Sequence, residues 1–311
     1  MFFRRIETER GEYGAFMDYG LKPLGREKLW LWLMLVPTLV GLAFGTIGSL
    51  FATLGLSLFD WDLINPPTWV GTENYAALFQ NENYIEAFTN TLRFSALYVP
   101  GVVIISLLLA VLLNRKIRGV GIFRTIYFLP TVTSAVATAL VWNMIYGKET
   151  GILNFMLEAL GFAPICWLCT DHAMMSVVIV NIWGAIGEGM IIFLAGLTTI
   201  PRDYYEAASL DGADNFQQFF RVTLPLVTPS IFFQTLISAI NAFQAYDYIY
   251  MLTRRGQGDS SVPVAVYSIY RNAFHFFRMG DASAQAIQLA LLVGVFMAIM
   301  FWWERHYVVY E

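Results

Sequence analysis

The chain has 311 residues, of which 57% are hydrophobic and 14% are charged, and its formal net charge is −4. Its mean hydropathy of +0.57 is far above that of soluble proteins. These values exclude an ordinary soluble globular protein, and the sequence carries no nucleic-acid-binding signature. We therefore expect an integral membrane protein.

Six apolar runs are long enough to be transmembrane helices, because about 20 helical residues cross the hydrocarbon of a bilayer. The predicted spans are residues 29–51, 91–113, 122–145, 174–197, 226–250 and 285–303. The first run is too long for the core of a signal peptide, and no small-residue cleavage site follows it cleanly. We expect this first span to remain in the mature protein.

The distribution of Lys and Arg predicts the orientation of these spans. Both tails, together with the loops that join spans two to three and four to five, carry thirteen Lys and Arg residues, whereas the opposite side carries six. The outer segment 60–86 carries five acidic residues and no basic one. Both termini and the loop between spans four and five are therefore predicted to be cytosolic.

This fourth-to-fifth loop has the pattern of a helix–turn–helix. Pro201 suits the first turn of a helix, where its missing N–H costs nothing. Gly212 stands where the helix must end in a residue that tolerates positive φ. Asp214 and Gln217 form a plausible capping pair for a second short helix, and Pro225 precedes the next apolar run. Small alanines keep the first helix slim, so that another protein surface can approach its backbone.

The same loop resembles the EAA loop of the inner-membrane permeases of binding-protein-dependent ABC importers. The family pattern is Glu-Ala-Ala, a Gly shortly after it, and a later Leu-Pro; the chain matches at Glu206, Ala207, Ala208, Gly212, Leu224 and Pro225. The run Asp211–Ala213 is similar to the carbohydrate (MalF-like) branch. Further similar stretches within residues 30–303 are Val70-Gly71, Asn74-Tyr75, Asn90–Leu92, Ala195–Leu197, Ile200-Pro201, Asp247–Tyr250 and Tyr267–Phe274.

The resemblance implies an all-α integral membrane protein with six transmembrane helices in the type I importer permease (MetI-like) fold. Both termini would be cytosolic, in the plasma (inner) membrane of a prokaryote. The implied division is a cytosolic tail at 1–28, a first transmembrane helix and outer loop at 29–86, a permease core at 87–304 with its EAA loop at 201–225, and a tail at 305–311.

The resemblance also implies the role and the partners of such a chain. It would conduct a sugar or oligosaccharide, or alternatively a polyol, glycerol phosphate or another small solute, and would not itself be an enzyme. A second homologous permease, an ABC ATPase dimer that binds ATP and Mg²⁺, and an extracytoplasmic solute-binding protein would complete the importer within the membrane lipid. The chain has no GxxxxGK[ST] sequence, so we expect no cofactor on it. The implied ATPase-coupling residues are Glu206, Ala207, Ala208, Asp211, Gly212 and Ala213.

Polar residues inside the predicted spans are candidates for a solute pathway. Glu188 lies within span four, where a carboxylate costs about 2.5–3.5 kcal/mol on insertion scales. Asn181 and Gly184 share its helical face. One interpretation is a polar stripe along the solute path, and the other is a polar clamp between helices with the carboxyl group protonated.

Span five offers a similar face at Gln234, Ser238, Asn241, Ala245 and Tyr248, widened near its outer end by Gln244, Tyr246 and Asp247. Amides, carboxylates and aromatic rings suit a polyhydroxylated ligand, whereas Asn and Gln also hold helices together at about 0.6 kcal/mol each. Span three adds a weaker stripe of hydroxyl groups at Thr131, Ser134 and Thr138.

The two cysteines, Cys166 and Cys169, lie in the predicted outer loop between spans three and four. Three readings stay open, namely a structural disulfide in an oxidising compartment, two inert thiols, or a metal site. With His172 as the nearest further ligand, a zinc site would be one ligand short, so we expect no metal.

Overall fold

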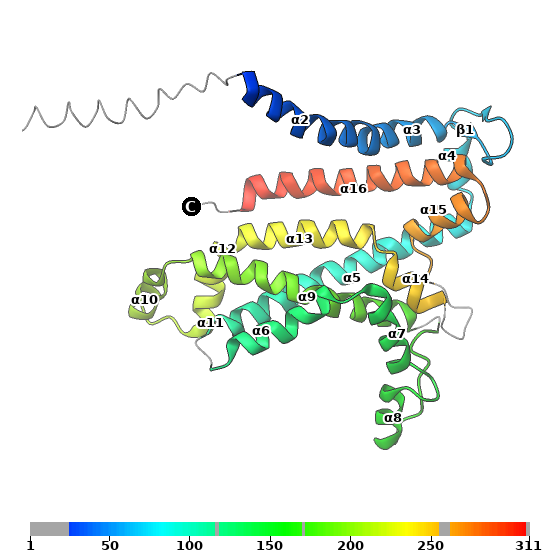
Figure 1. Cartoon of the computed structure of the whole chain (residues 1–311). Helices are drawn as coiled ribbons and strands as arrows, with labels where there is room; N and C mark the ends of the chain where they lie inside the picture. The colour runs from blue at the N-terminus through cyan, green and yellow to red at the C-terminus, as the bar shows by residue number, and fades with distance from the viewer. Residues whose placement is uncertain (1–24, 116–117, 170–171, 255–261, 309–311) are drawn as a thin grey trace, which may run out of the picture. The chain divides into compact units, whose positions relative to one another are not determined.

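The structure, a computed structural model, describes residues 25–115, 118–169, 172–254 and 262–308 (Figure 1). Most of the tail predicted at 1–28 lies outside these residues. The elements are α2 (Gly25–Gly41), the π-helix η1 (Leu42–Gly48), α3 (Ser49–Leu56), β1 (Phe59–Asp60), β2 (Thr68–Trp69), α4 (Glu73–Leu78), α5 (Glu82–Leu113), α6 (Val120–Phe128), the 3₁₀-helix η2 (Leu129–Val132), α7 (Ala135–Ile145), α8 (Ile152–Ala159), α9 (Ala173–Thr199), α10 (Arg202–Leu210), α11 (Asn215–Gln218), the π-helix η3 (Phe219–Thr223), α12 (Leu224–Leu226), α13 (Thr228–Phe243), α14 (Asp247–Arg254), α15 (Ala265–Phe274) and α16 (Met279–Tyr307). The prediction of a helical protein is confirmed.

The chain divides into two compact units, residues 1–52 and residues 53–311. In its described part, the first unit contains α2, η1 and the start of α3. The run Leu29–Leu56 is long and apolar enough to cross a membrane, and none of its most apolar window is buried. A helix that is apolar on every side is typical of a membrane span.

By length and composition, four helices among the described residues can cross a membrane, or six when each of two bent pairs counts as one span. The four are Leu29–Leu56, Glu82–Leu113, Ala173–Thr199 and Met279–His306. The bent pairs are Val120–Val132 with Ala135–Ile145, at 102°, and Asn215–Leu226 with Thr228–Phe243, at 67°. Four of the six predicted runs are thus long helices, whereas the third and fifth correspond to bent pairs and not to continuous helices.

Local chemistry explains the break in the third span. Pro130 has no N–H to donate to the preceding turn, and the chain there narrows to the 3₁₀-helix η2. The Thr133 hydroxyl then donates to the carbonyl of Pro130 at 2.7 Å, and Ser134 adopts an extended conformation before α7 begins. An average hydropathy does not detect such a turn, because the window of residues around the turn can remain apolar as a whole.

The long helix α9 forms the centre of the second unit and packs along α5, while α13 also packs against α5 (Figure 1). Small residues on α9 allow close approach of its neighbours. A Cβ added at Gly187 would lie 2.8 Å from Cα of Phe128, and one added at Gly189 would lie 2.8 Å from Cβ of Ser106. Close packing at small residues is a common way for membrane helices to associate.

Contacts at the two ends of α16 show which parts of the second unit lie near the same end of this helix. The rings of Phe232, near the start of α13, and Trp303, near the end of α16, are 6.5 Å apart. At the other end, the N–H of Met279 donates to the carbonyl of Trp61 at 2.8 Å, beside the β1–β2 hairpin. The end of α16 therefore lies on the side of α10–α12, in agreement with a cytosolic position for both.

The outer segment that connects β1 to β2 is shaped by one carboxylate. Backbone N–H groups of Asn65 and Ile64 donate to Oδ1 of Asp62, at 2.8 and 3.0 Å. These bonds hold the pKa of the exposed Asp62 carboxyl below its usual range. The result is a defined turn, and not an open loop, at this end of the protein.

Candidate functional site

The segment 201–225 forms the predicted helix–turn–helix. Helix α10 ends at Leu210, and Gly212 follows with φ of +83°, in the left-handed region that favours glycine. Asp214 and Gln217 form a complete capping box at the start of α11, with the N–H of Gln217 donating to Oδ1 of Asp214 at 2.7 Å. Pro201 departs from the prediction, because it caps α10 from outside and does not lie in its first turn.

Two side-chain contacts that sequence reasoning missed hold this helix–turn–helix together. Nε2 of Gln218 donates to Oγ of Ser209 at 2.9 Å and to the carbonyl of Ala213 at 3.1 Å. The hydroxyl groups of Tyr205 and Thr223 lie 3.1 Å apart and share a hydrogen bond. These bonds link α10 to the segment that follows it.

The base of the helix–turn–helix rests on a buried apolar cluster. Tyr205, Phe219 and Leu224 pack against it. Its buried members are Leu107, Ala110, Leu113, Met190, Phe193, Leu194, Leu197, Ile200 and Val227. Because most of these belong to α5 and α9, the helix–turn–helix is packed directly onto the ends of the two central helices.

The predicted coupling residues lie on the free side of the helix–turn–helix. Glu206, Ala207, Asp211 and Gly212 are exposed, and Ala208 and Ala213 are half-buried. Sequence reasoning overlooked two apolar neighbours, Leu210 and Phe216, whose side chains are 89% and 71% exposed. The available signal was the occurrence of large apolar residues within an otherwise polar loop. Both side chains lie in the same short segment, beside the predicted coupling residues.

The predicted pathway residues come together around one cavity of about 370 Å³. The cavity lies where α9, the end of α13, the start of α14 and η2 meet. Its lining consists of Tyr98, Pro130, Thr131, Asn181, Gly184, Ala185, Glu188, Asn241, Gln244, Ala245, Tyr246, Asp247 and Tyr248. This lining includes the following candidates that were named from the sequence: Asn181, Glu188, Asn241, Gln244, Tyr246, Asp247 and Tyr248.

The polar face predicted along span five is divided by a break in the helix. Helix α13 ends at Phe243, and α14 begins only at Asp247. The outer residues from Asn241 onward line the cavity, whereas Gln234 and Ser238 are buried, at 2% and 1% exposure. Gln234, Ser238 and Asn241 thus lie on the one helix α13, whose inner part is buried between helices, and the break between Phe243 and Asp247 separates them from Tyr248.

The hydroxyl stripe predicted on span three is likewise not a single helical face. Thr131 belongs to η2 and lines the cavity, and its Oγ1 donates to the carbonyl of Gly184 at 3.3 Å. Ser134 caps α7, and Thr138 lies within α7, where its Oγ1 is 3.0 Å from that of Thr133. Of the three residues, Thr131 is the one that reaches the cavity.

The polar side chains that line the cavity include acids and amides. Glu188 and Asp247 contribute carboxyl groups, and Asn181, Asn241 and Gln244 contribute amides. No Lys, Arg or His is among the described residues that line it. Such a lining can accept many hydrogen bonds from hydroxyl groups, and its described residues offer no cation to an anionic solute.

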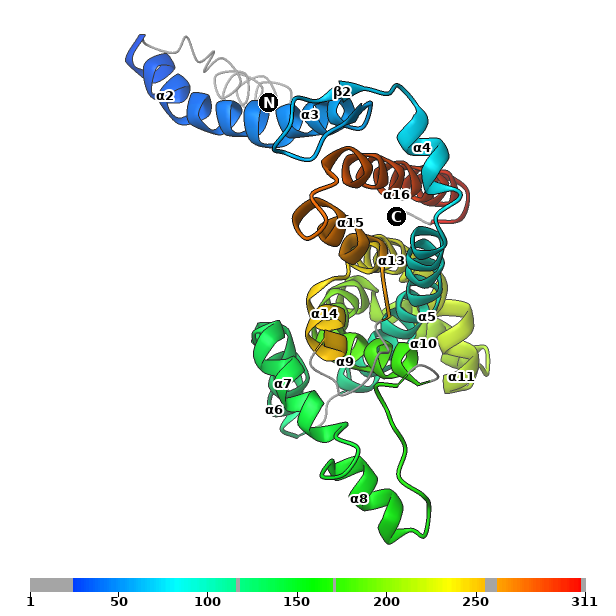
Figure 2. The same ribbon diagram turned by 90° about the vertical axis from the view of Figure 1, so that its right-hand side faces the viewer.

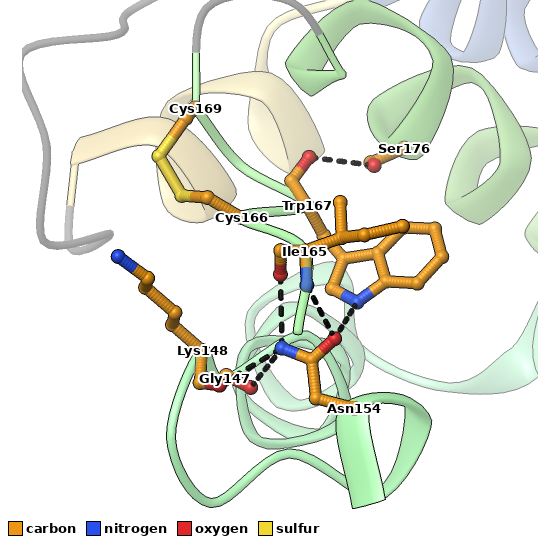
Figure 3. Close-up of a disulfide and its surroundings, with 8 residues drawn as sticks. All are labelled: Gly147, Lys148, Asn154, Ile165, Cys166, Trp167, Cys169 and Ser176. Carbon is orange, nitrogen blue, oxygen red and sulfur yellow. Dashed lines mark hydrogen bonds between the residues drawn. A yellow bond between two sulfur atoms is a disulfide. The ribbon is translucent and has the colours of Figure 1, made fainter. Parts of the chain in front are cut away.

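The outer segment between α7 and α9 is organised around Asn154, which is 2% exposed (Figure 3). Its Nδ2 donates to the carbonyls of Lys148 and Ile165, both at 2.9 Å, and to that of Gly147 at 3.4 Å. Its Oδ1 accepts from the N–H of Ile165 and from Nε1 of Trp167, both at 3.0 Å. One buried amide thus holds three stretches of backbone together.

The two cysteines are adjacent to this amide-centred structure. The structure joins Cys166 and Cys169 in a disulfide, with their Cα atoms 5.4 Å apart (Figure 3). Oγ of Ser176, in α9, donates to the carbonyl of Trp167 at 2.7 Å and connects the loop to the central helix. Helix α8 extends beyond α7 in both views (Figures 1 and 2).

Comparison with known proteins decides the family. Residues 75–308 match the family described as "Binding-protein-dependent transport system inner membrane component". The chain belongs to this family. The probable ABC transporter permease YesP of Bacillus subtilis is 35% identical to it over 281 residues, which cover 88% of this chain and 90% of that protein.

Other relatives and solved structures agree with this assignment. The trehalose/maltose permease MalF of Thermococcus litoralis is 31% identical to this protein, and the match covers 86% of this chain and 91% of MalF. A bacterial ABC transporter that imports the acidic polysaccharide alginate contains a chain with a TM-score of 0.79 and 26% identity, covering 90% of this permease and 96% of that chain.

Family membership fixes the general character of the protein. The permease is a multi-pass helical protein of the inner membrane and a component of an ABC importer. It is not itself catalytic, and a permease subunit of this family needs no cofactor of its own. The resemblance seen in the EAA loop is thus confirmed for the chain as a whole.

Proposed function

We propose that the permease conducts a neutral sugar or oligosaccharide through the cavity between α9, α13 and α14. The observation that carries this proposal is the chemistry of the lining, which combines carboxyl groups, amides and tyrosines. Carboxyl and amide groups hydrogen-bond to hydroxyl groups, and tyrosine rings offer flat apolar faces with a polar edge. A polyhydroxylated solute uses both kinds of contact.

The same lining argues against an anionic solute. Among the relatives, the UgpA protein of Salmonella choleraesuis is named as a permease for sn-glycerol 3-phosphate and is 29% identical to this chain. For a phosphate ester we would expect a cation in the path, yet the described lining presents Glu188 and Asp247. Two carboxylates would repel an anionic solute, and this repulsion is strongest away from bulk water. A neutral polyol is the closest alternative to a sugar.

We further propose that the segment 201–225 couples the permease to an ABC ATPase dimer. The exposed Leu210 and Phe216 would enter a cleft on the ATPase, beside Glu206, Ala207, Ala208, Asp211, Gly212 and Ala213. Burial of a Leu or Phe side chain contributes about 1.5–3 kcal/mol, so this pair alone is a substantial anchor.

Helix α9 provides the mechanical link between this loop and the cavity. Its end at Thr199 lies directly before α10, and Glu188 lies in its middle. At 1.5 Å per residue, about 17 Å separates these two positions along the helix. A rotation of α10 on closure of the ATPase would then reach the cavity through one rigid element, as alternating access requires.

The remaining proposed partners are a second homologous permease and an extracytoplasmic solute-binding protein. Support comes from the alginate transporter, a chain of which has a TM-score of 0.80 to this permease in a complex with a pentasaccharide-bound periplasmic protein. ATP and Mg²⁺ would bind to the ATPase partner.

Uptake by the complete importer in proteoliposomes tests the substrate class. The assay compares a labelled disaccharide, a polyol and glycerol 3-phosphate, with ATP enclosed on the ATPase side. We expect ATP-dependent uptake of the sugar and none of the phosphate ester. Preferential uptake of glycerol 3-phosphate would overturn the proposal of a neutral solute and leave the family assignment intact.

A further inference from the structure

A group of four tyrosines begins at the cavity and extends away from it. Tyr246 lines the cavity, and its ring stacks on that of Tyr250 with the centroids 5.1 Å apart. Tyr250 in turn lies 5.8 Å from Tyr267 and 6.4 Å from Tyr270, both on α15. Figure 2 shows α14 and α15 beside each other, as these ring contacts require. We call these residues the tyrosine group.

The tyrosine group continues to the protein surface. Tyr270 lies 5.6 Å from Tyr246 and 5.4 Å from Phe274, whose side chain is 58% exposed. Arg271 lies over the ring of Tyr267, 5.6 Å from its centroid, and helps to fix that ring. An uninterrupted series of aromatic rings therefore runs from the cavity to exposed surface.

Burial distinguishes the tyrosine group from the aromatic residues of the core. Phe94 and Phe193 are 1% and 0% exposed, whereas all four tyrosines are only partly buried. Of the four, Tyr267 also packs against the core cluster that contains Phe94. Partly exposed tyrosines present an apolar face and a hydroxyl group together, which is the combination that a sugar ring needs.

Resting on the proposed function, we propose that the tyrosine group is a second carbohydrate subsite. One sugar ring would lie in the cavity, against Glu188 and Asn241, and the next would lie on Tyr250 and Tyr270. The substrate class would then be an oligosaccharide, since a monosaccharide cannot occupy both places. The tyrosine group would also bind the leading end of the oligosaccharide when the oligosaccharide leaves the binding protein.

Uptake as a function of chain length tests this subsite in the complete importer. The probes are a mono-, di-, tri- and tetrasaccharide of one sugar, used at concentrations that saturate the binding protein. The variants are Tyr270→Leu, which removes the ring, and Tyr270→Phe, which keeps it. Phe162→Leu is the matched control, because Phe162 is 62% exposed in the outer segment after α8 and lies outside the group.

We expect Tyr270→Leu to lower uptake of the tri- and tetrasaccharides by roughly two- to ten-fold and to leave the monosaccharide rate unchanged. Tyr270→Phe should retain most of the uptake, and Phe162→Leu should match the wild type. An equal loss at every length, or no loss at any length, would overturn the subsite while sugar uptake itself persists. A wild-type importer that takes up no sugar would instead overturn the proposed function, and the subsite with it.

Discussion

Nε2 of Gln234 donates a hydrogen bond to Oγ of Ser238 at 3.0 Å in the buried inner half of α13. Oε1 of Gln234 has no partner among the residues that the structure describes. The polar face of span five is therefore of two kinds, with an inner half that contacts other helices and an outer half at the cavity. Asn241 is the first residue of the outer half.

Replacement of Gln234 tests this division. Gln234→Met keeps the length of the side chain and removes a buried polar group that is only partly satisfied, so the free energy of unfolding should change by less than about 1.5 kcal/mol. Uptake should remain at the wild-type level in proteoliposomes. Asn241→Leu, in the outer half of the same helix, should reduce uptake. A stable Gln234→Met protein that fails to transport would assign the inner half to the solute path.

Close contact of α9 with the end of α6 and with η2 makes Gly187 sensitive to substitution. A Cβ there would lie 2.8 Å from Cα of Phe128 and 2.9 Å from Oγ1 of Thr131, and backbone atoms cannot yield easily. We expect Gly187→Ala to destabilise the protein by about 1–3 kcal/mol, measured as loss of monodisperse protein after heating. Gly294→Ala in α16 is the control, since its Cβ would meet no atom within 4 Å. Equal stability of the two variants would contradict the close approach.

The turn at Gly212 offers a test of the coupling loop that depends on backbone conformation alone. A Cβ at this position meets no atom within 4 Å, so only the positive φ opposes a side chain. Gly212→Val should cost about 1–3 kcal/mol locally and uncouple uptake from ATP hydrolysis, whereas Gly212→Asn, which tolerates this region, should retain much of the activity. Membrane insertion of both variants is checked first. Wild-type uptake by Gly212→Val would remove the turn from the coupling mechanism.

In the outer segment between α7 and α9, the side-chain amide of Asn154 should contribute more to stability than the disulfide. Joining Cys166 to Cys169 closes a very short loop, which stabilises by about 2 kcal/mol in the chain-entropy model. Asn154→Ala leaves several buried backbone groups without partners, at about 1–3 kcal/mol for each. Limited proteolysis of the 147–169 segment should therefore show faster cleavage in Asn154→Ala than in the double variant Cys166→Ser/Cys169→Ser. The reverse order would make the disulfide the main support.

The sequence sufficed for the helical class, the six apolar runs and the turn chemistry of 201–225. Each of these depends on a signal that is local in the chain, such as hydropathy over one window or the capping pair of Asp214 and Gln217. The cavity candidates were found for a related reason, because a polar residue such as Glu188 is conspicuous in an apolar run.

Features that depend on contacts between distant segments were missed. The bonds from Gln218 to Ser209 and from Tyr205 to Thr223 exist only after α10 folds back toward η3. The contact of Tyr250 with Tyr267 similarly joins α14 to α15 across intervening chain. Hydropathy did not reveal the breaks at Thr133 and Val227, since the average over the window around each stays apolar whether or not the helix continues.

The most direct test of the account is the rate of ATP-driven sugar uptake by Glu188→Gln in the reconstituted importer, with sugar-loaded binding protein at saturation. Glu188→Gln replaces one carboxyl oxygen by an amide NH2 group, and loss of one hydrogen bond to the solute costs about 1 kcal/mol, so we predict that this rate falls roughly five-fold. Glu158→Gln, exposed on α8, should match the wild type. Identical rates for Glu188→Gln and the wild type, for every sugar transported, would contradict a solute path through this cavity.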